Sequence, residues 1–299
     1  MIRIPRSTYY ARKTSEPARA KADADLRDRL EELALSFPRY GYRRMAAQLR
    51  REEWIVNRKR VLRVMRESDL LCKIRRRFVQ TTDSKHNFPI HPNLLQDFRA
   101  TAINQVWVAD ITYIRILTGF AYLATILDAF SRKVVGWALS RTLTAEMTCA
   151  ALQAAYTARR PPKGLILHSD RGVQYACGDY VALAEGYGMQ ISMSRKGNPY
   201  DNPIAESFFK TLKTEEVYLM DVGTFEELSS RLPEYIEVVY NTKRLHSSLG
   251  YLPPAEFEAY KIFNPQTHPH LSVGESCPIQ GVHTSLPGER ESLEASCLS

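Results

Sequence analysis

The spacing of apolar residues along the chain changes near residue 105. Before that point, apolar residues recur at helical spacing in three stretches, 22–36, 43–51 and 57–66. Pro38 and Gly41 separate the first two stretches, because both residues resist helix continuation. Asn57 suits the N-cap of the third stretch. Three short helices joined by turns predict a small all-α helix-turn-helix domain.

After residue 105, β-branched and aromatic runs are followed by longer helical patterns. Three such runs joined by tight turns predict an antiparallel meander, and two short buried runs between helices predict two more strands. The expected strands are 106–114, 121–127, 133–139, 164–168 and 190–194, and the expected helices include 143–158, 177–187 and 224–242. Pro233 should kink or split the last helix. The sequence therefore predicts an α/β fold, a mixed sheet with flanking helices.

A further helix is predicted after a loop rich in Gly, Asn and Pro. Asn202 suits its N-cap and Pro203 its first position, where a missing N–H costs nothing. Glu206, Lys210 and Lys213 share one face at i, i+4 and i+7. A carboxylate with two lysines behind it suits metal and phosphate chemistry, but it equally suits a solvated surface. This stretch alone does not decide between them.

The length of 299 residues suggests two domains with connecting segments. The expected division is a basic arm at 1–20, the helix-turn-helix domain at 21–79, a linker at 80–104 with a short helix at 92–98, the α/β domain at 105–262 and a disordered tail at 263–299. No apolar run is long enough to span a membrane and no secretory signal is visible. Five scattered cysteines without a C-x-x-C pair argue against a disulfide framework and a cysteine-based zinc site, and favour the cytoplasm.

Positive charge is concentrated in the first third of the chain. Residues 1–100 hold 24 Lys and Arg against 12 Asp and Glu, whereas residues 101–299 hold 17 against 21. This asymmetry favours nucleic acid as the partner of the helix-turn-helix domain, the alternative being a generically basic soluble domain. The candidate DNA contacts are Arg43, Arg44, Arg58, Lys59, Arg60 and Arg63.

Acidic residues occupy positions that packing alone does not explain. Asp110 lies inside a strongly apolar run, and Asp170 follows a buried strand. A carboxylate in such a place is costly to desolvate unless it is paired or bound to a metal. Together with Glu206 these oxygens would suit Mg²⁺ or Mn²⁺, and two such ions about 4 Å apart support phosphoryl displacement. The alternative is three unrelated acids, and spacing alone leaves both possibilities open.

Several longer motifs carry a family resemblance. They are Trp107–Ile114, Leu127–Arg132, His168–Tyr175, Ser192–Ser194, Asp201–Asn202, Glu206–Lys213, Tyr240–Arg244 and His246–Tyr251, together with Tyr40–Arg44 and Asn57–Val61 in the helix-turn-helix domain. Over roughly residues 5–260 the chain resembles the DDE transposases of the insertion sequence three family. Their catalytic domain is similar to retroviral integrases and has the RNase H-like fold. Leu245 stands where the family commonly has proline.

The resemblance implies a role for each matching position. Asp110, Asp170 and Glu206 would be the catalytic residues and hold two Mg²⁺ ions. Lys213 matches a basic residue that contacts the DNA end, and Lys210 shares its face. Other family positions near the site are His168, Arg171, Gln174, Tyr175 and Asn202, which either support the ligands, contact DNA or are structural.

The implied activity is metal-dependent DNA cleavage and strand transfer during transposition. The implied partners are DNA, further copies of the chain and a protein from an upstream reading frame, in the bacterial nucleoid. Two alternatives remain: a truncated transposase that binds DNA and represses without catalysis, and an RNase H-like nuclease acting on RNA–DNA hybrids.

Smaller features also carry expectations. Asp128 and Arg132 are expected to form a buried ion pair that fixes a hairpin, and Trp107 is expected in the core. Arg244 and His246 either touch DNA or pack the C-terminal helix. The loop 197–200 is a candidate mobile flap over the active site.

Overall fold

The computed structural model describes residues 6–72, 91–96, 98–117, 119–195, 202–219 and 223–264, with residues 6–20 described by their backbone. The expected flap at 197–200, nearly all of the tail and about half of the linker lie outside these ranges. In the described part of the linker, residues 94–96 form a turn rather than the expected short helix. The Leu94 N–H donates a hydrogen bond to Ser192 Oγ (2.9 Å), which gives this segment a fixed partner on the sheet.

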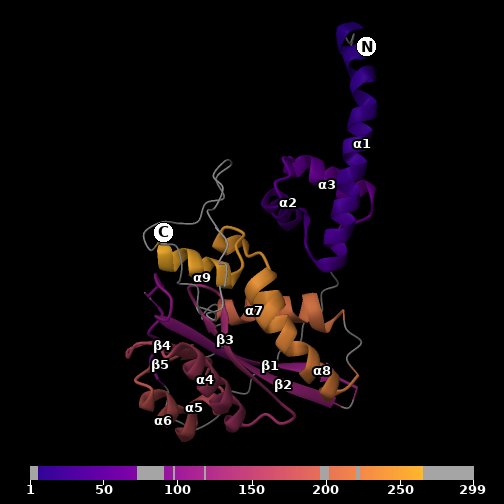
Figure 1. Ribbon diagram of the computed structural model, residues 1–299. Coiled ribbons are helices and arrows are strands. Elements are labelled where there is room, and N and C mark those ends of the chain that lie inside the picture. Colours follow the sequence, from indigo (N-terminus) through magenta and orange to yellow (C-terminus); the bar gives the residue numbers. More distant parts are fainter. Residues whose placement is uncertain are drawn as a thin grey trace, which may run out of the picture. The chain divides into compact units, whose positions relative to one another are not determined.

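Three helices form the N-terminal all-α domain, as predicted (Figure 1). They are α1 (Arg6–Ser36), α2 (Tyr42–Arg51) and α3 (Arg58–Glu67). Helix α1 begins at Arg6, so most of the stretch expected as a basic arm has a helical backbone; alanine and arginine in this stretch are strong helix formers. Asn57 caps α3 by accepting a hydrogen bond from the Lys59 N–H (2.9 Å).

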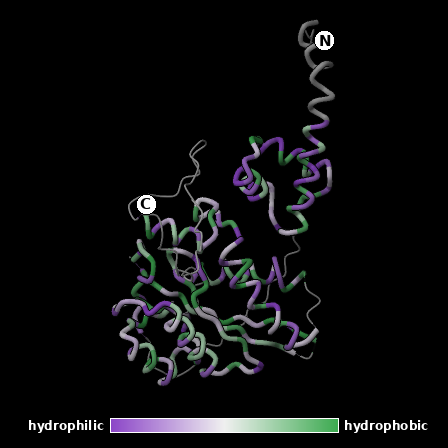
Figure 2. The backbone as a smooth tube through the Cα atoms, viewed as in Figure 1, coloured by the Kyte–Doolittle hydropathy of each residue, from purple (hydrophilic) through white to green (hydrophobic). Residues whose placement is uncertain are grey.

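Apolar side chains from all three helices meet in one core cluster, and Figure 2 shows how hydrophobic and hydrophilic residues alternate along them. One member comes from far along the chain: Leu245, which is 1 % exposed. Its N–H donates to the hydroxyl of Tyr40 (2.8 Å), and Arg51 pairs with Glu256 (2.6 Å). The α/β domain therefore completes the core of the N-terminal domain.

The α/β domain is built on a five-stranded mixed sheet in the order β3-β2-β1-β4-β5. Its strands are β1 (Val106–Ile116), β2 (Gly119–Asp128), β3 (Val134–Ser140), β4 (Ile166–Ser169) and β5 (Gln190–Met193). The first three are antiparallel, whereas β4 is parallel to β1, and β5 to β4. All five predicted strands are confirmed.

Helices cover both faces of the sheet (Figure 1). One face carries α4 (Ala145–Arg159), α5 (Val173–Ala176) and α6 (Gly178–Gly186); the other carries α7 (Pro203–Leu212) and α8 (Phe225–Pro233). Strand β1 contributes to both cores: Val106 and Val108 pack on the α7 side, and Trp107 and Ala109 on the α4 side. The predicted mixed sheet with flanking helices is therefore confirmed.

Two π-helical segments follow the helices α7 and α8. Helix α7 passes into η2 (Lys213–Val217), and α8 ends at Pro233 and passes into η3 (Glu234–Lys243). The predicted break at Pro233 is confirmed, since proline removes one N–H from the helical ladder. A 3₁₀ turn, η4 (Ser247–Leu249), and helix α9 (Pro254–Phe263) complete the described chain.

The turn between β2 and β3 differs from the expected ion pair. Asp128 is fully buried, and its carboxylate accepts three backbone hydrogen bonds, from the N–H groups of Asn104, Phe130 and Ser131 at 2.6–2.9 Å. Within the described residues no ion pair joins Asp128 to Arg132, whose φ of 63° carries the chain around the turn. The carboxylate therefore fixes this hairpin through the backbone rather than through the arginine.

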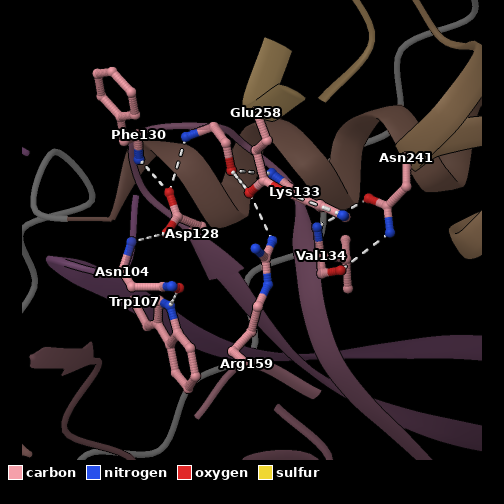
Figure 3. A network of polar contacts seen from close by, with 10 residues as sticks. Asn104, Trp107, Asp128, Phe130, Lys133, Val134, Arg159, Asn241 and Glu258 are labelled. Carbon is pink, nitrogen blue, oxygen red and sulfur yellow. Dashed lines mark hydrogen bonds and ion pairs between the residues drawn. The ribbon is translucent and has the colours of Figure 1, made fainter. Parts of the chain in front are cut away.

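A second buried carboxylate ties α9 to the sheet (Figure 3). Glu258 accepts a hydrogen bond from Ser131 Oγ (2.7 Å) and pairs with Arg159 of α4 (2.6 Å) and Lys133 (3.1 Å). Because Glu258 is 5 % exposed and has two cationic partners, its burial is compensated. Helix α9 is thereby fixed to the rest of the α/β domain.

Candidate active site

The register of the parallel strands brings two carboxylates together. Strands β1 and β4 pair Val106 with Ile166 and Val108 with His168. Asp110 follows Val108 by two residues on β1, and Asp170 follows His168 by two residues, just past the end of β4, so both leave neighbouring parallel strands in the same direction. Both aspartates lie where β4 ends, the edge of a sheet at which ligands commonly bind.

Asn202 sets the position of the helix that carries Glu206. Its side-chain oxygen accepts a hydrogen bond from the Ala205 N–H (3.4 Å), which caps α7. Its amide nitrogen donates to the carbonyl of Ala109 (3.5 Å), the residue before Asp110. The start of α7 is thus held next to β1, with Glu206 in the first turn and its side chain exposed to solvent. The predicted N-cap is confirmed.

The carboxylates and Lys213 share one electrostatic environment. Burial raises the pKa of Asp110 well above its usual range, and the negative charges of Asp170 and Glu206 raise it further. Partial desolvation also raises the pKa of the solvent-exposed Glu206 carboxyl. Burial lowers the pKa of Lys213, an effect that the charge of Asp110 opposes. Concentrated negative charge of this kind would be relieved by a bound cation.

The described residues provide part of a binding site for a divalent metal ion. In the described segments no three His, Cys, Asp or Glu side chains are placed to hold a metal ion together. Asp110 and Asp170 influence each other electrostatically and offer hard carboxylate oxygens, a chemistry that Mg²⁺ prefers. A site completed by Glu206 stays a prediction.

The loop after Asp170 contains a glycine that the sequence analysis did not single out. The Gly172 N–H donates to Asp170 Oδ1 (2.9 Å), and a Cβ at Gly172 would lie 2.9 Å from the same oxygen. A side chain at this position would therefore push against the carboxylate. The signal was available in the Asp-Arg-Gly sequence, since glycine often permits such close approach.

His168 acts as a structural bridge between β4 and β5. It is fully buried, with Nδ1 2.8 Å from Ser192 Oγ and Nε2 3.1 Å from Ser194 Oγ. Ser194 Oγ donates to the Ser169 carbonyl and Ser192 Oγ accepts from Leu94, so Nε2 carries the proton and Nδ1 accepts. His168 therefore links β4 to the end of β5, two residues before Asp170 in the sequence.

The other positions beside the site also make local contacts. Arg171 Nε donates to the Ser194 carbonyl (2.7 Å). Tyr175 is 2 % exposed and packs against the Tyr180 ring (centroids 5.2 Å apart), and burial raises its pKa well above the usual range. Gln174 is half-buried, and its backbone carbonyl accepts a hydrogen bond from Thr148 Oγ1 (3.3 Å). These contacts favour the supporting role.

Two basic residues follow Glu206 along its helix. Lys210 is exposed in the last turn of α7. Lys213 is half-buried, with its ammonium 5.2 Å from the centre of the Tyr113 ring. Lys210 therefore lies on the same helix as Glu206 and is open to solvent, whereas Lys213 begins η2 and lies against β1.

Arg244 and His246 pack inside the protein, which decides between their two expected roles. Both are buried, and Arg244 donates two hydrogen bonds to Glu215 (2.7 Å each). Arg44 of α2 pairs with the same carboxylate (3.3 Å). These residues therefore join the two domains.

The six candidate DNA contacts of the N-terminal domain fall into two groups. Arg60 and Arg63 both pair with Asp23 (2.7 Å each), and Arg44 pairs with Glu215. Arg43, Arg58 and Lys59 instead are exposed and line one hollow. The structure brings this second group together.

Comparisons with known proteins agree with this architecture. A family model described as HTH-like domain matches residues 21–78, and two described as integrase core domain match residues 100–199 and 187–254. A helix-turn-helix domain followed by an integrase core defines the class of the protein as a DNA-transposing enzyme with a polynucleotidyl transferase core.

Two relatives match over most of their length. The transposase InsF for insertion sequence IS3A of Escherichia coli is 38 % identical over 86 % of this chain and 91 % of its own. An uncharacterized 31 kDa protein of insertion element IS600 of Shigella sonnei is 45 % identical over 85 % of this chain and 94 % of its own. The chain belongs to the IS3 family of transposases.

Among solved structures, the chain is similar to the catalytic core domain of BIV integrase, with 20 % sequence identity and a TM-score of 0.42. The match covers 55 % of this chain and 99 % of the integrase chain.

No helix in the described ranges is long and apolar enough to cross a membrane.

Proposed function

We propose that this transposase cleaves and joins DNA through Asp110, Asp170 and Glu206. The observation that carries the proposal is the β1–β4 register, in which Val108 pairs with His168, two residues before Asp110 and Asp170 respectively. The raised pKa of Asp110, to which both other carboxylates contribute, supports it. These three residues would hold two Mg²⁺ ions, which supply charge neutralisation at the attacking and leaving oxygens when bound.

The reaction consists of two phosphoryl transfers without a covalent protein intermediate. In the first, a water oxygen bonds to the phosphorus at the element's end and the bond to the 3′-oxygen breaks. In the second, the freed 3′-hydroxyl bonds to a target phosphorus and displaces another 3′-oxygen. Lys213 and Lys210 would hold the phosphates beside Glu206. The partners would be element ends, target DNA and further copies of the chain.

The test uses the purified full chain with duplexes that carry the element's terminal repeats. Asp110→Asn, Asp170→Asn and Glu206→Gln should each abolish cleavage and joining in Mg²⁺ while DNA binding persists. Glu185→Gln is the matched control, because Glu185 is exposed on α6. Wild-type activity in any of the three variants would remove that residue from the triad.

The same preparation separates the two alternative functions. A DNA-binding repressor without catalysis would bind the repeats and never join them. A nuclease of the RNase H type would cleave RNA–DNA hybrids in preference to the repeats. Joining that appears only after the upstream-frame protein is added would identify that protein as a required partner.

A further inference from the structure

A hollow of about 350 Å³ lies where the N-terminal domain meets the chain after η4. Its lining residues are Tyr42, Arg43, Arg58, Lys59, Leu62 and Tyr251. Three of the six are cations and none is acidic, so the hollow carries a concentrated positive charge. Two tyrosines give it aromatic walls.

The cations of the hollow differ from their neighbours in having no acidic partner. Within the described chain, no carboxylate forms an ion pair with Arg43, Arg58 or Lys59; Arg43 Nε donates to the Tyr42 hydroxyl instead (3.2 Å). By contrast, Arg60 of the same helix as Lys59 is neutralised by Asp23. Unpaired cations around a concave surface attract an anion, and phosphate groups of DNA are the fitting class.

Tyr251 reaches the hollow from the α/β domain in a strained conformation. Its φ of 64° lies in the left-handed region, which is unfavourable for an aromatic residue. Its N–H donates to the His246 carbonyl (2.8 Å), and His246 also pairs with Leu252, so the surrounding backbone holds the strain in place. Strain of this kind is concentrated at functional sites. Its side chain also packs against the core of the N-terminal domain.

We propose that this hollow is a DNA-backbone site shared by the two domains. Arg43, Arg58 and Lys59 neutralise phosphates, and the Tyr251 hydroxyl donates a hydrogen bond to a phosphate oxygen. The inference rests on the proposed function, because its ligand is the DNA of the transposition reaction. DNA held by the N-terminal domain would then touch the α/β domain directly.

The experiment measures binding of a fluorescein-labelled 30-base-pair duplex to the full chain by anisotropy, across a series of salt concentrations. Arg58→Gln and Lys59→Gln should each lower the slope of log affinity against log salt by about 1. Tyr251→Phe, which keeps the ring, should weaken binding about tenfold with the slope unchanged. Arg66→Gln is the control, because Arg66 is exposed on α3 outside the hollow.

Two outcomes would overturn the inference. Wild-type affinity in Tyr251→Phe would restrict the site to the N-terminal domain. An equal loss of slope in Arg66→Gln would mean diffuse attraction rather than a defined hollow. Both outcomes leave the catalytic proposal standing, since that proposal fails on joining activity in the triad variants.

Discussion

His246 makes the stability of this protein sensitive to acid. It is 7 % exposed, its Nε2 lies 3.4 Å from Arg244 Nη1, and its ring meets the edge of Tyr240 at 4.9 Å between centroids. Arg244 has no acceptor, so it donates and Nε2 must be unprotonated. Burial, reinforced by the charges of Arg244, Arg44 and Arg132, lowers the pKa of His246 to about 2.

The size of the effect follows from linkage. In the unfolded chain the histidine titrates with a pKa near 6.5, so acid adds a proton to the unfolded state but not to the folded state. Because the pKa of His246 is lower in the folded state than in the unfolded state, the free energy of unfolding decreases as the pH falls below 6.5. Between pH 7 and pH 5 the difference amounts to about 2 kcal/mol.

The assay compares the wild type with His246→Gln by urea unfolding at both pH values. Glutamine can accept the hydrogen bond from Arg244 and does not titrate. The wild type should lose about 2 kcal/mol more than the variant between pH 7 and pH 5, because the contributions of other groups cancel in the comparison. Equal losses in the two proteins would show that the folded state takes up the proton, and the reasoning from burial would fail.

Three further changes test the packing between elements. Leu245→Ala should cost about 2–5 kcal/mol in urea unfolding, as for a large buried side chain, and a cost below about 1 kcal/mol would show that the cluster closes without it. Glu215→Gln leaves Arg244 buried without its charge partner and should lower the free energy of unfolding by about 3–5 kcal/mol. Glu256→Gln breaks a more exposed ion pair and should lower it by under about 1 kcal/mol. Similar losses in the two variants would contradict this reasoning. Asp128→Asn turns one acceptor into a donor facing the Asn104 N–H and should cost about 1.5–3 kcal/mol, measured as a lower thermal midpoint.

The sequence predicts most of the fold because its local signals agree with the tertiary structure. The β-branched runs form strands in the expected order, and the predicted caps at Asn57 and Asn202 both form. Asp110 and Asp170 can be identified from the sequence because a carboxylate inside an apolar strand, or directly after one, is costly to desolvate. Their proximity depends on the register between β1 and β4, which periodicity does not fix.

The predictions that were wrong or incomplete concern charged residues whose partners are distant in the sequence. Asp23 pairs with both Arg60 and Arg63, which follow it by 37 and 40 positions in the sequence. Glu215 pairs with Arg44 across 171 positions. A basic helical pattern does not reveal which guanidinium groups are already paired. Asp128 was expected to pair with a nearby cation, whereas three backbone N–H groups are closer at hand in the folded turn.

The position of Leu245 also orders events during synthesis. The N-terminal domain leaves the ribosome first, but its core cluster gains its last buried residue 180 positions after Met65. At ordinary rates of translation that delay is on the order of ten to forty seconds. Tyr251 follows six residues later, after Asp110, Asp170 and Glu206 have all been made. A nascent chain would therefore complete the proposed DNA-backbone site only when the three proposed catalytic carboxylates are already present.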